Sequence, residues 1–354
     1  MTIKNIKFLL ITACVGCGVS MLTSCNDEWE SEQYEQYISF RAPLDTEGNS
    51  VGVTTIHVPY TRMNADGTPR YGEGISSFDL PVIVSGSTHN SADRHVHIAY
   101  DTDTLNTLNY ARFNTRKELY YQDMSSYTTF DDVLMIPKGQ DKGLLTLRFD
   151  FHNFDLAEKW VLPLTIEDGP DYDYIRNPRK NYAKAMLRVL PYTDFSGVYQ
   201  ANNQKFYVNA INGEELSEAE RGEPSALSEV QFYVVDANTV FFYAGNFDET
   251  RLDRKQYKIF ARFHGDTSGT VELWCDNPDV KFVENKQASF RMTSEPDAVQ
   301  PYLLRRDVII NNMDYNFTDH TSTLGSAIEY NVSGTLTMER VLNTQMPEED
   351  QVVW

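Results

Sequence analysis

Four aromatic residues have the type and the surroundings that suit stacking on a sugar ring. Each borders a turn expected between two strands and has asparagine, aspartate or proline within two positions; the four are Phe247, Trp274, Tyr302 and Tyr315. An aromatic face packs against the C–H-rich face of a sugar, while an amide or carboxylate beside it bonds the hydroxyl groups. β-rich domains also use aromatic side chains as core, so a core position is the alternative role for each of the four.

The sequence contains no motif of a familiar catalytic or metal centre. His-Glu-x-x-His, Gly-x-Ser-x-Gly, the phosphate-loop glycine pattern and a cysteine pair suited to zinc are all absent. His95 and His97 share one face of an expected strand and could present two ligands, but no third ligand accompanies them. Residues 168–173 (DGPDYD) could form a calcium loop, although they lack the EF-hand order of ligands, and a solvated turn is the alternative.

Acidic residues are too numerous to reveal a catalytic pair. Glycoside hydrolysis needs two carboxylates roughly 5–10 Å apart, and with 51 aspartates and glutamates the sequence cannot single out such a pair. We therefore predict that the protein is not an enzyme and that it holds no metal or other cofactor. An unrecognised glycoside hydrolase ranks last among the alternatives.

The first 25 residues have the features of an export signal. Lys4 and Lys7 precede an apolar run, Phe8 to Met21, with no acidic residue among them. This run of roughly 14 residues is shorter than the 20 or so that a membrane-spanning helix needs. The segment ends in Leu22-Thr23-Ser24-Cys25, which resembles the bacterial lipobox. The resemblance implies that residues 1–24 are removed and that Cys25 is diacylated on sulfur; a cleaved signal without lipid is the alternative.

The residues after Cys25 predict where the anchor holds the protein. Asn26-Asp27-Glu28-Trp29-Glu30 is acidic and resembles the surface-export signal of Bacteroidetes lipoproteins, which implies the outer leaflet of the outer membrane. An ordinary solvated tether is the alternative. We expect residues 25–36 to form this lipidated tether.

Charge and cysteine content exclude several classes of partner and of fold. The net charge of −20 argues against nucleic acid and anionic lipid as partners. Cys14 and Cys17 leave with the signal and Cys25 is acylated, so Cys275 remains alone and no internal disulfide is possible. The fold must therefore be held by its hydrophobic cores, for which the chain is long enough. Cys275 lies in an apolar stretch and is expected to be a buried structural thiol.

Residues 37–191 are expected to form a first all-β domain. Short β-like runs separated by turns every ten or so residues indicate a β-sandwich. The runs are 37–40, 51–60, 77–85, 95–100, 133–136, 144–151, 160–166 and 185–190. Residues 103–121 are the exception and could hold a short helix or a long crossing loop. Phe149 and Trp160 lie in strong runs and are assigned to the core.

Residues 192–342 are expected to form a second all-β domain, a sandwich or a barrel-like fold, followed by a tail at 343–354. The boundary is placed at Pro191-Tyr192-Thr193-Asp194, after which a new series of runs begins. These runs are 195–199, 230–235, 239–244, 257–263, 270–274, 288–293, 304–310, 314–318 and 328–340. Gly334 within the last run predicts a bend or bulge there.

Both halves of the chain resemble a lipoprotein family of Bacteroidetes that is encoded beside Sus-type glycan-uptake systems. In the first half the matching segments are 105–110, 120–121, 135–139, 145–149 and, most clearly, Trp160 to Ile166. In the second half they are 194–199 and 330–336. The resemblance implies an N-terminal Ig-like sandwich, a β-rich C-terminal domain, and no catalytic motif.

The predicted function follows from the signal and from this resemblance. We expect a non-catalytic, lipid-anchored protein exposed on the outer membrane, which binds a polysaccharide or oligosaccharide as an accessory of a Sus-type transporter. A structural or adhesive lipoprotein that acts through protein contacts is the alternative. Asp103-Thr104-Leu105 resembles the Bacteroidetes O-glycosylation site, which makes Thr104 a candidate for modification after export.

Overall fold

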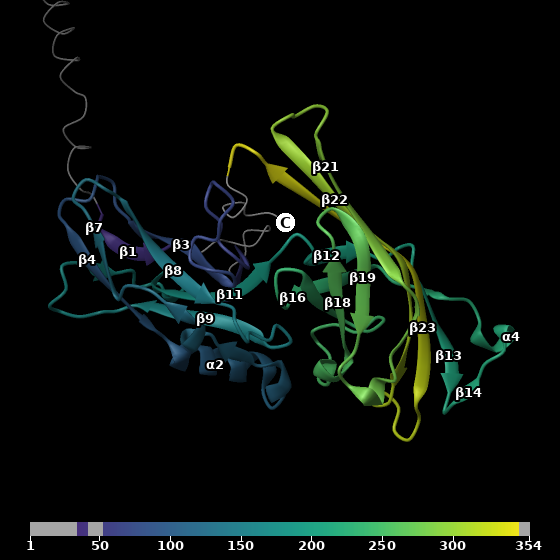
Figure 1. The fold of residues 1–354 in the computed structure, drawn as a ribbon. Helices are drawn as coiled ribbons and strands as arrows, with labels where there is room; N and C mark the ends of the chain where they lie inside the picture. The colour runs from purple at the N-terminus through teal and green to yellow at the C-terminus, as the bar shows by residue number, and fades with distance from the viewer. Residues whose placement is uncertain (1–33, 42–51, 347–354) are drawn as a thin grey trace, which may run out of the picture.

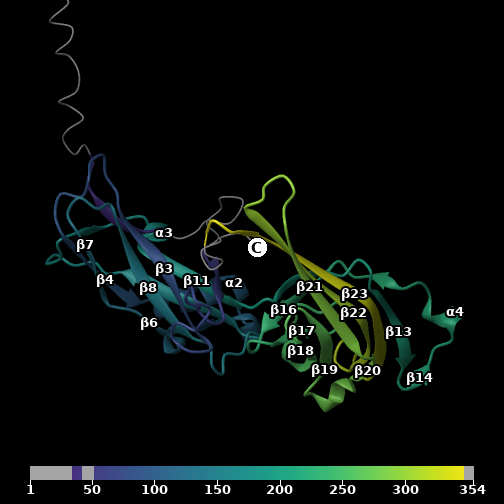
Figure 2. The same ribbon diagram turned by 45° about the horizontal axis from the view of Figure 1, so that its top comes forward.

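The chain folds into two all-β domains that lie side by side (Figures 1 and 2), which confirms the predicted fold class. A computed structural model describes residues 34–41 and 52–346. The expected signal, Cys25 and most of the expected tether lie outside the described residues, as do residues 347–354. The first domain is a sandwich of two sheets, and the second is a barrel-like sheet.

Two sheets pack face to face in the first domain, within the described ranges. One sheet has the strand order β10 (Ile175–Arg176), β1 (Tyr37–Phe40), β3 (Ile75–Val84), β8 (Lys142–Asp150) and β6 (Thr128–Thr129). The other has the order β2 (Thr54–Pro59), β11 (Lys184–Tyr192), β9 (Lys159–Ile166), β4 (Arg94–Tyr100) and β7 (Val133–Ile136), with β5 (Tyr121–Asp123) beside β9. Alternate side chains such as Val82, Leu147, Leu164 and Leu187 fill the space between the sheets.

A helix covers part of the outer face of the second sheet. The segment predicted as helix or loop forms α2 (Thr102–Phe113), which Asp101 caps by accepting a hydrogen bond from the Thr104 N–H at 3.1 Å. Leu105 of α2 packs against Val161 of β9 in a satellite core. Because β9 is thus buried on both faces, its sequence is an almost continuous apolar run instead of an alternating one.

The second domain closes on itself. Its strands follow the order β12 (Gly197–Gln200), β16 (Glu229–Val234), β17 (Thr239–Tyr243), β18 (Lys258–His264), β19 (Ser268–Trp274), β21 (Ala288–Pro296), β22 (Leu303–Asp319) and β23 (Ile328–Asn343). β23 pairs with β22 on one side and with β12 on the other, which completes the ring. Large side chains fill the interior, among them Tyr199, Phe232, Phe242 and Phe317, as expected for a small barrel.

Several short elements lie outside these layers. β13 (Lys205–Ile211) extends the sheet beside β23 and carries β14 (Glu214–Glu215) and β15 (Ser225–Ala226), while β20 (Val283–Lys286) pairs with β22. The short helices are η2 (Lys117–Leu119), η3 (Ser125–Tyr127), α3 (Lys180–Ala183), α4 (Glu218–Arg221), η4 (Arg254–Tyr257) and η5 (Pro278–Val280). Sequence reasoning did not predict β13.

The two runs predicted at 304–310 and 314–318 are one strand, so that prediction was wrong. β22 continues through the asparagines between them because a bulge takes up one extra residue: Asn311 and Asn312 lie opposite Thr335 alone, between the pairs Ile310–Leu336 and Met313–Gly334. Asn312 in the bulge has a φ of 57°. The irregularity predicted at Gly334 is therefore confirmed, with the one extra residue on the partner strand β22.

Strand β17 joins the two domains because both of its faces are buried. Val240 and Phe242 point into the barrel core, whereas Phe241 and Tyr243 pack into the core of the sandwich. Tyr233 of β16 lies in the same cluster as Phe241, with ring centroids 5.1 Å apart. One hydrophobic core therefore runs from the sandwich to the outer wall of the barrel.

Charged side chains surround this apolar contact. Arg188 of β11 makes two hydrogen bonds to the carboxylate of Glu249, one of them at 3.2 Å, and Lys159 lies 3.7 Å from the same group. Arg254 is fully buried; its Nε donates to the Ala157 carbonyl at 3.0 Å. Removing one partner of such a contact would leave a buried charge uncompensated, which costs more than the pair itself contributes.

Gly334→Ala is expected to destabilise the barrel by more than about 1 kcal/mol. Gly334 has a φ of 148°, and an added Cβ would lie 2.2 Å from the Asn203 carbonyl oxygen, which belongs to the backbone and cannot move aside. Urea unfolding monitored by circular dichroism measures the change. Gly67→Ala is the control, since Gly67 has a φ of 80° with nothing within 4 Å of a Cβ. An equal loss in both variants would show that the close approach of Asn203 does not matter.

His57→Gln is expected to make stability less sensitive to acid. Burial lowers the pKa of His57 to about 4, and the Arg340 and Arg188 guanidinium groups add to this effect. The unfolded chain protonates this histidine near its ordinary pKa of 6.5. The stability that depends on neutral His57 is therefore complete above pH 6.5 and is lost as the pH falls from 6.5 towards 4, by up to about 3 kcal/mol.

Urea titrations at pH 7.5, 5.5 and 4.5 test this window. The free energy of unfolding should fall less steeply with acid in His57→Gln than in the wild type. His89→Gln is the control, because the His89 side chain is 83% exposed. Identical slopes in the wild type and His57→Gln would contradict the assignment.

Candidate functional site

The structure does not bring the four predicted aromatic residues together. Phe247 and Tyr315 both contact Phe317 at one end of the barrel, with ring centroids at 5.7 and 6.3 Å. Trp274 lies on the outer wall of the barrel at the end of β19. Tyr302 is 40% exposed just before β22. They therefore cannot line a single site.

Tyr315 belongs to the core, which corrects its assignment as a ligand-binding candidate. Only 2% of it is exposed, and its hydroxyl accepts a hydrogen bond from the Gly245 N–H at 3.3 Å. Burial raises the pKa of this phenol above its ordinary value. The asparagines that suggested a binding site all lie within β22: Asn311 and Asn312 form its bulge, and Asn316 pairs with Asn331 of β23.

The face of Phe247 is occupied by a side chain of the protein itself. The Arg251 guanidinium carbon lies 3.8 Å from the Phe247 ring centroid and 4.7 Å from that of Tyr257. Arg251 also binds Asp253 at 2.6 Å and Asp319 at 3.3 Å. This network joins the loop after β17 to the end of β22. Because Arg251 covers its ring, Phe247 has a structural role and is not available to stack on a sugar.

Asp319 is the acceptor at the centre of that network. Burial raises its pKa, but hydrogen bonds from Ser322, Thr321 and Tyr257 outweigh this effect and lower the pKa to about 2. The Tyr257 hydroxyl and the Ser322 N–H both donate to the Asp319 carboxylate, each at 3.0 Å. Asp319 is therefore an ionised anchor for the loop between β22 and β23.

Trp274 ends a row of aromatic rings that crosses four neighbouring strands. Tyr233, Phe241, Phe260 and Trp274 pair in register on β16 to β19, with successive ring centroids 5.1, 6.2 and 5.2 Å apart. The sandwich covers the first two rings, whereas Phe260 and Trp274 are half-buried. The Arg262 guanidinium lies 5.1 Å from the Trp274 centroid. Trp274, at the exposed end of this row, remains a candidate ligand contact. Tyr302, which lies outside the row and is exposed, remains a second candidate.

Thr104 lies in the first turn of α2, where its hydroxyl is already engaged. The Lys184 ammonium donates to the Thr104 hydroxyl at 2.6 Å and also pairs with Asp101. The next residue, Leu105, is buried in the satellite core. Modification of Thr104 stays a prediction, and these contacts require that it precede folding or break the bond to Lys184.

The two histidines considered as metal ligands have other partners. The His95 ring nitrogen Nδ1 lies 2.8 Å from Asp173, and the His97 ring stacks on Tyr172 at 4.2 Å. Among residues 34–41 and 52–346, no group of three or more histidine, cysteine or acidic side chains is arranged to hold a metal ion.

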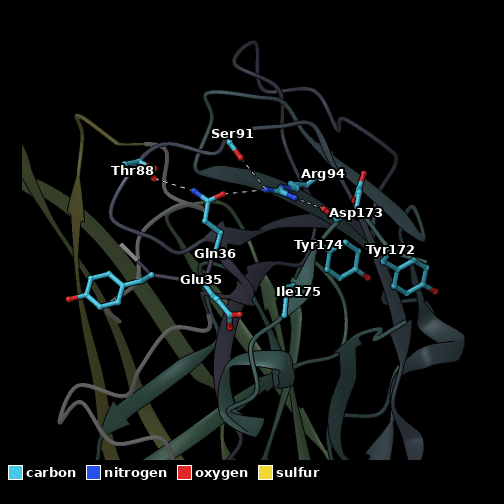
Figure 3. Close-up of a pocket in the computed structure, with 10 residues that line it drawn as sticks. Glu35, Gln36, Thr88, Ser91, Arg94, Tyr172, Asp173, Tyr174 and Ile175 are labelled. Carbon is cyan, nitrogen blue, oxygen red and sulfur yellow. Dashed lines mark hydrogen bonds between the residues drawn. The ribbon is translucent and has the colours of Figure 1, made fainter. Parts of the chain in front are cut away.

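A pocket of about 490 Å³ lies at the end of the sandwich, where the sequence predicted no saccharide-binding residue (Figure 3). It is built by the chain before β1, the loop before β4 and the turn before β10. Its lining comprises Tyr34, Glu35, Gln36, Thr88, Ser91, Arg94, Tyr172, Asp173, Tyr174 and Ile175. These segments are far apart in the sequence, so the pocket exists only in the folded domain.

Arg94 organises the polar side of the pocket. Its guanidinium donates to the Gln36 side chain at 3.3 Å and to the Asp173 backbone carbonyl (Figure 3). It also donates to the Asn90 side chain at 3.1 Å. The Gln36 amide in turn donates to the His89 carbonyl at 3.2 Å. One arginine at the start of β4 thereby fixes both edges of the pocket.

The turn at 168–173 supplies the aromatic side. The rings of Tyr172 and Tyr174 lie nearly parallel, with centroids 5.3 Å apart, and the Tyr172 hydroxyl donates to Glu167 at 2.9 Å. Burial raises the pKa of Asp173, but hydrogen bonds from His95 outweigh it and hold the pKa below its ordinary value. The segment considered as a calcium loop therefore carries an ionised carboxylate, bound to His95, and two stacked tyrosine rings. The Tyr-Asp-Tyr sequence at 172–174 is the signal that could have indicated this pocket.

The fold defines a two-domain all-β protein in which a sandwich precedes a barrel. A family described as a domain of unknown function, DUF4973, matches residues 29–170. A second family, described as "-like, C-terminal", matches residues 183–337. Among curated proteins, none matches the chain.

Solved structures from Bacteroides share this architecture. An auxiliary nutrient binding protein from Bacteroides thetaiotaomicron is 45% identical with a TM-score of 0.79, covering 91% of this chain and 100% of the other. A Bacteroides ovatus protein of unknown function is 40% identical with a TM-score of 0.75, covering 90% and 100%. A Bacteroides ovatus multidomain protein including DUF1735 is 39% identical with a TM-score of 0.74, again covering 90% and 100%.

The protein therefore belongs to the same family as these two-domain Bacteroides proteins, because the identity extends over the whole length of each solved chain. Within the described ranges, none of the helices has the length and apolar character needed to cross a membrane.

Proposed function

We propose that the protein is a lipid-anchored accessory of nutrient uptake at the outer-membrane surface, that it binds a polysaccharide or oligosaccharide, and that it is not an enzyme. The observation that carries this proposal is the 45% identity, over the full solved length, to a structure named as an auxiliary nutrient binding protein. The resemblance of the sequence to lipoproteins of Sus-type loci supports a saccharide as the nutrient, a Sus-type transporter as the partner, and an Ig-like first domain.

The sandwich-end pocket has the composition that saccharide binding requires. Its volume of about 490 Å³ lies within the range of roughly 300–1,000 Å³ typical of ligand sites. The partly exposed ring of Tyr172 offers apolar surface, backed by the buried ring of Tyr174, while Arg94, Gln36 and Asp173 offer hydrogen bonds. Arg94 binds Gln36 and the Asp173 backbone carbonyl, and the Asp173 carboxylate accepts from the His95 N–H. These groups are therefore held in place before a ligand arrives, which lowers the entropy lost on binding.

The predicted anchor would hold this pocket near the membrane. From Cys25 to Tyr34 the chain can span at most about 30 Å. A pocket that begins at Tyr34 would thus stay close to the membrane surface, a position that suits transfer of a sugar to a transporter in the same membrane.

A structural or adhesive role is the second candidate. Val133 and Met135 of β7, the last strand of its sheet, are 38% and 55% exposed. Apolar side chains on an edge strand favour contact with another protein.

Saccharide binding predicts retarded migration in native affinity electrophoresis. Residues 26–354, which include every described residue, would be run in gels containing plant, host or microbial polysaccharides. One glycan class is expected to retard the wild type, and Tyr172→Ala is expected to weaken this because it removes the aromatic wall of the pocket. Tyr110→Ala is the control, since Tyr110 is 68% exposed on α2.

Two results would contradict this prediction. Retardation that survives Tyr172→Ala but is lost in Trp274→Ala would move the site to the barrel wall. No retardation of the folded protein by any glycan would favour the structural role.

Lipid anchoring predicts that the full-length protein, expressed in a Bacteroides host, incorporates a fatty-acid analogue and sediments with membranes. Cys25→Ala should abolish incorporation because it removes the sulfur that forms the thioether. Cys275→Ala is the matched control, since Cys275 is a half-buried thiol distant in sequence from the signal. A wild type that carries no label would contradict the anchor.

A further inference from the structure

A second hollow, of about 290 Å³, lies between the two domains and is separate from the sandwich-end pocket. The sandwich contributes His57 of β2 and Leu156 to its wall. The barrel contributes Val198 of β12, Gln231 of β16 and Met338 of β23. Because both domains form the wall, the hollow has this shape only while they are docked.

The charged groups of the wall are already engaged by the protein. Arg340 is 5% exposed and donates to the carbonyl oxygens of Thr193 at 3.2 Å and Ser196 at 2.9 Å. The Glu339 carboxylate lies 3.3 Å from the Arg305 Nε. Both groups are therefore held by bonds within the protein.

The other polar groups of the wall are neutral. Gln231 donates through its amide nitrogen to the Phe232 carbonyl at 3.0 Å, which leaves its amide oxygen as an acceptor. Among the described residues, the Gln200 side chain has no hydrogen-bond partner. His57 stays uncharged above about pH 4 because burial lowers its pKa. Amide and imidazole groups therefore face apolar Leu156 and Val198 across the hollow.

We propose that this interdomain hollow binds one neutral sugar ring, an inference that rests on the saccharide-binding role proposed above. The volume of about 290 Å³ is just below the range for ligand sites, roughly 300–1,000 Å³, which suits a single ring and not a chain. A sugar has apolar C–H faces that match Leu156, Val198 and Met338. Its hydroxyl groups both donate and accept, as the amides of Gln200 and Gln231 require.

Isothermal titration of the mature chain, residues 26–354, with free D-glucose, D-galactose, D-mannose, D-xylose, L-arabinose and L-fucose tests the inference. One of these neutral sugars is expected to bind. Val198→Trp, which fills the hollow from a position that is 45% exposed, should raise the Kd at least about tenfold. Gln231→Ala should raise it by a similar factor, because it removes the amide oxygen that accepts a hydrogen bond from a sugar hydroxyl. Tyr172→Ala, in the other pocket, should leave the Kd unchanged.

The outcomes separate this inference from the proposed function. Retardation by a polysaccharide without binding of any free sugar would overturn the interdomain site alone. Sugar binding that is unchanged in both Val198→Trp and Gln231→Ala would overturn it as well. Loss of binding in both variants, with Tyr172→Ala unaffected, would support it. D-glucuronic acid binding more tightly than every neutral sugar would contradict the neutral character of the site.

Discussion

The arrangement of this protein depends on the burial of the outer face of β17 against the sandwich. Phe241 and Tyr243 leave the barrel wall and enter the sandwich core, so the two domains share one apolar cluster. Full burial of a large side chain stabilises a fold by roughly 1.5–3 kcal/mol, and Tyr233 on the neighbouring strand adds to the same contact. A sandwich and a barrel joined only by residues 193–196 would otherwise be free to move relative to each other.

Paired and hydrogen-bonded charged groups surround the apolar contact between the domains. Glu249 lies between Arg188 and Lys159, and the fully buried Arg254 bonds carbonyl groups of the sandwich. Such groups contribute little net stability as pairs but make any other docking arrangement costly, because it would strand a buried charge. The interdomain hollow beside them, with His57 in its wall, keeps its shape for the same reason.

The all-β architecture and most strands could be predicted from the sequence, because alternating and β-branched runs act locally. Val133–Ile136 and Tyr37–Phe40 are strands with the predicted bounds. The predictions failed where hydrogen bonding to a neighbouring strand, and not the local residue pattern, decides where a strand runs. β22 continues across its bulge because β23 offers it partners along its whole length. β13 was missed; it pairs with the part of β23 that extends past the closed barrel, and it is only partly buried.

The candidate site also shows which features local sequence predicts and which only the tertiary structure decides. The signal and Cys25 are read from contiguous residues, and the sequence by itself determines that prediction. Local sequence also indicated which aromatic residues have polar neighbours, but only the tertiary structure decided that Tyr315 is core and that Arg251 covers Phe247. The sandwich-end pocket joins Gln36, Arg94 and Tyr172, which no local pattern connects. Periodicity reports which face of one strand is buried, whereas a site depends on which faces of distant strands meet, and that is set by packing across the whole core.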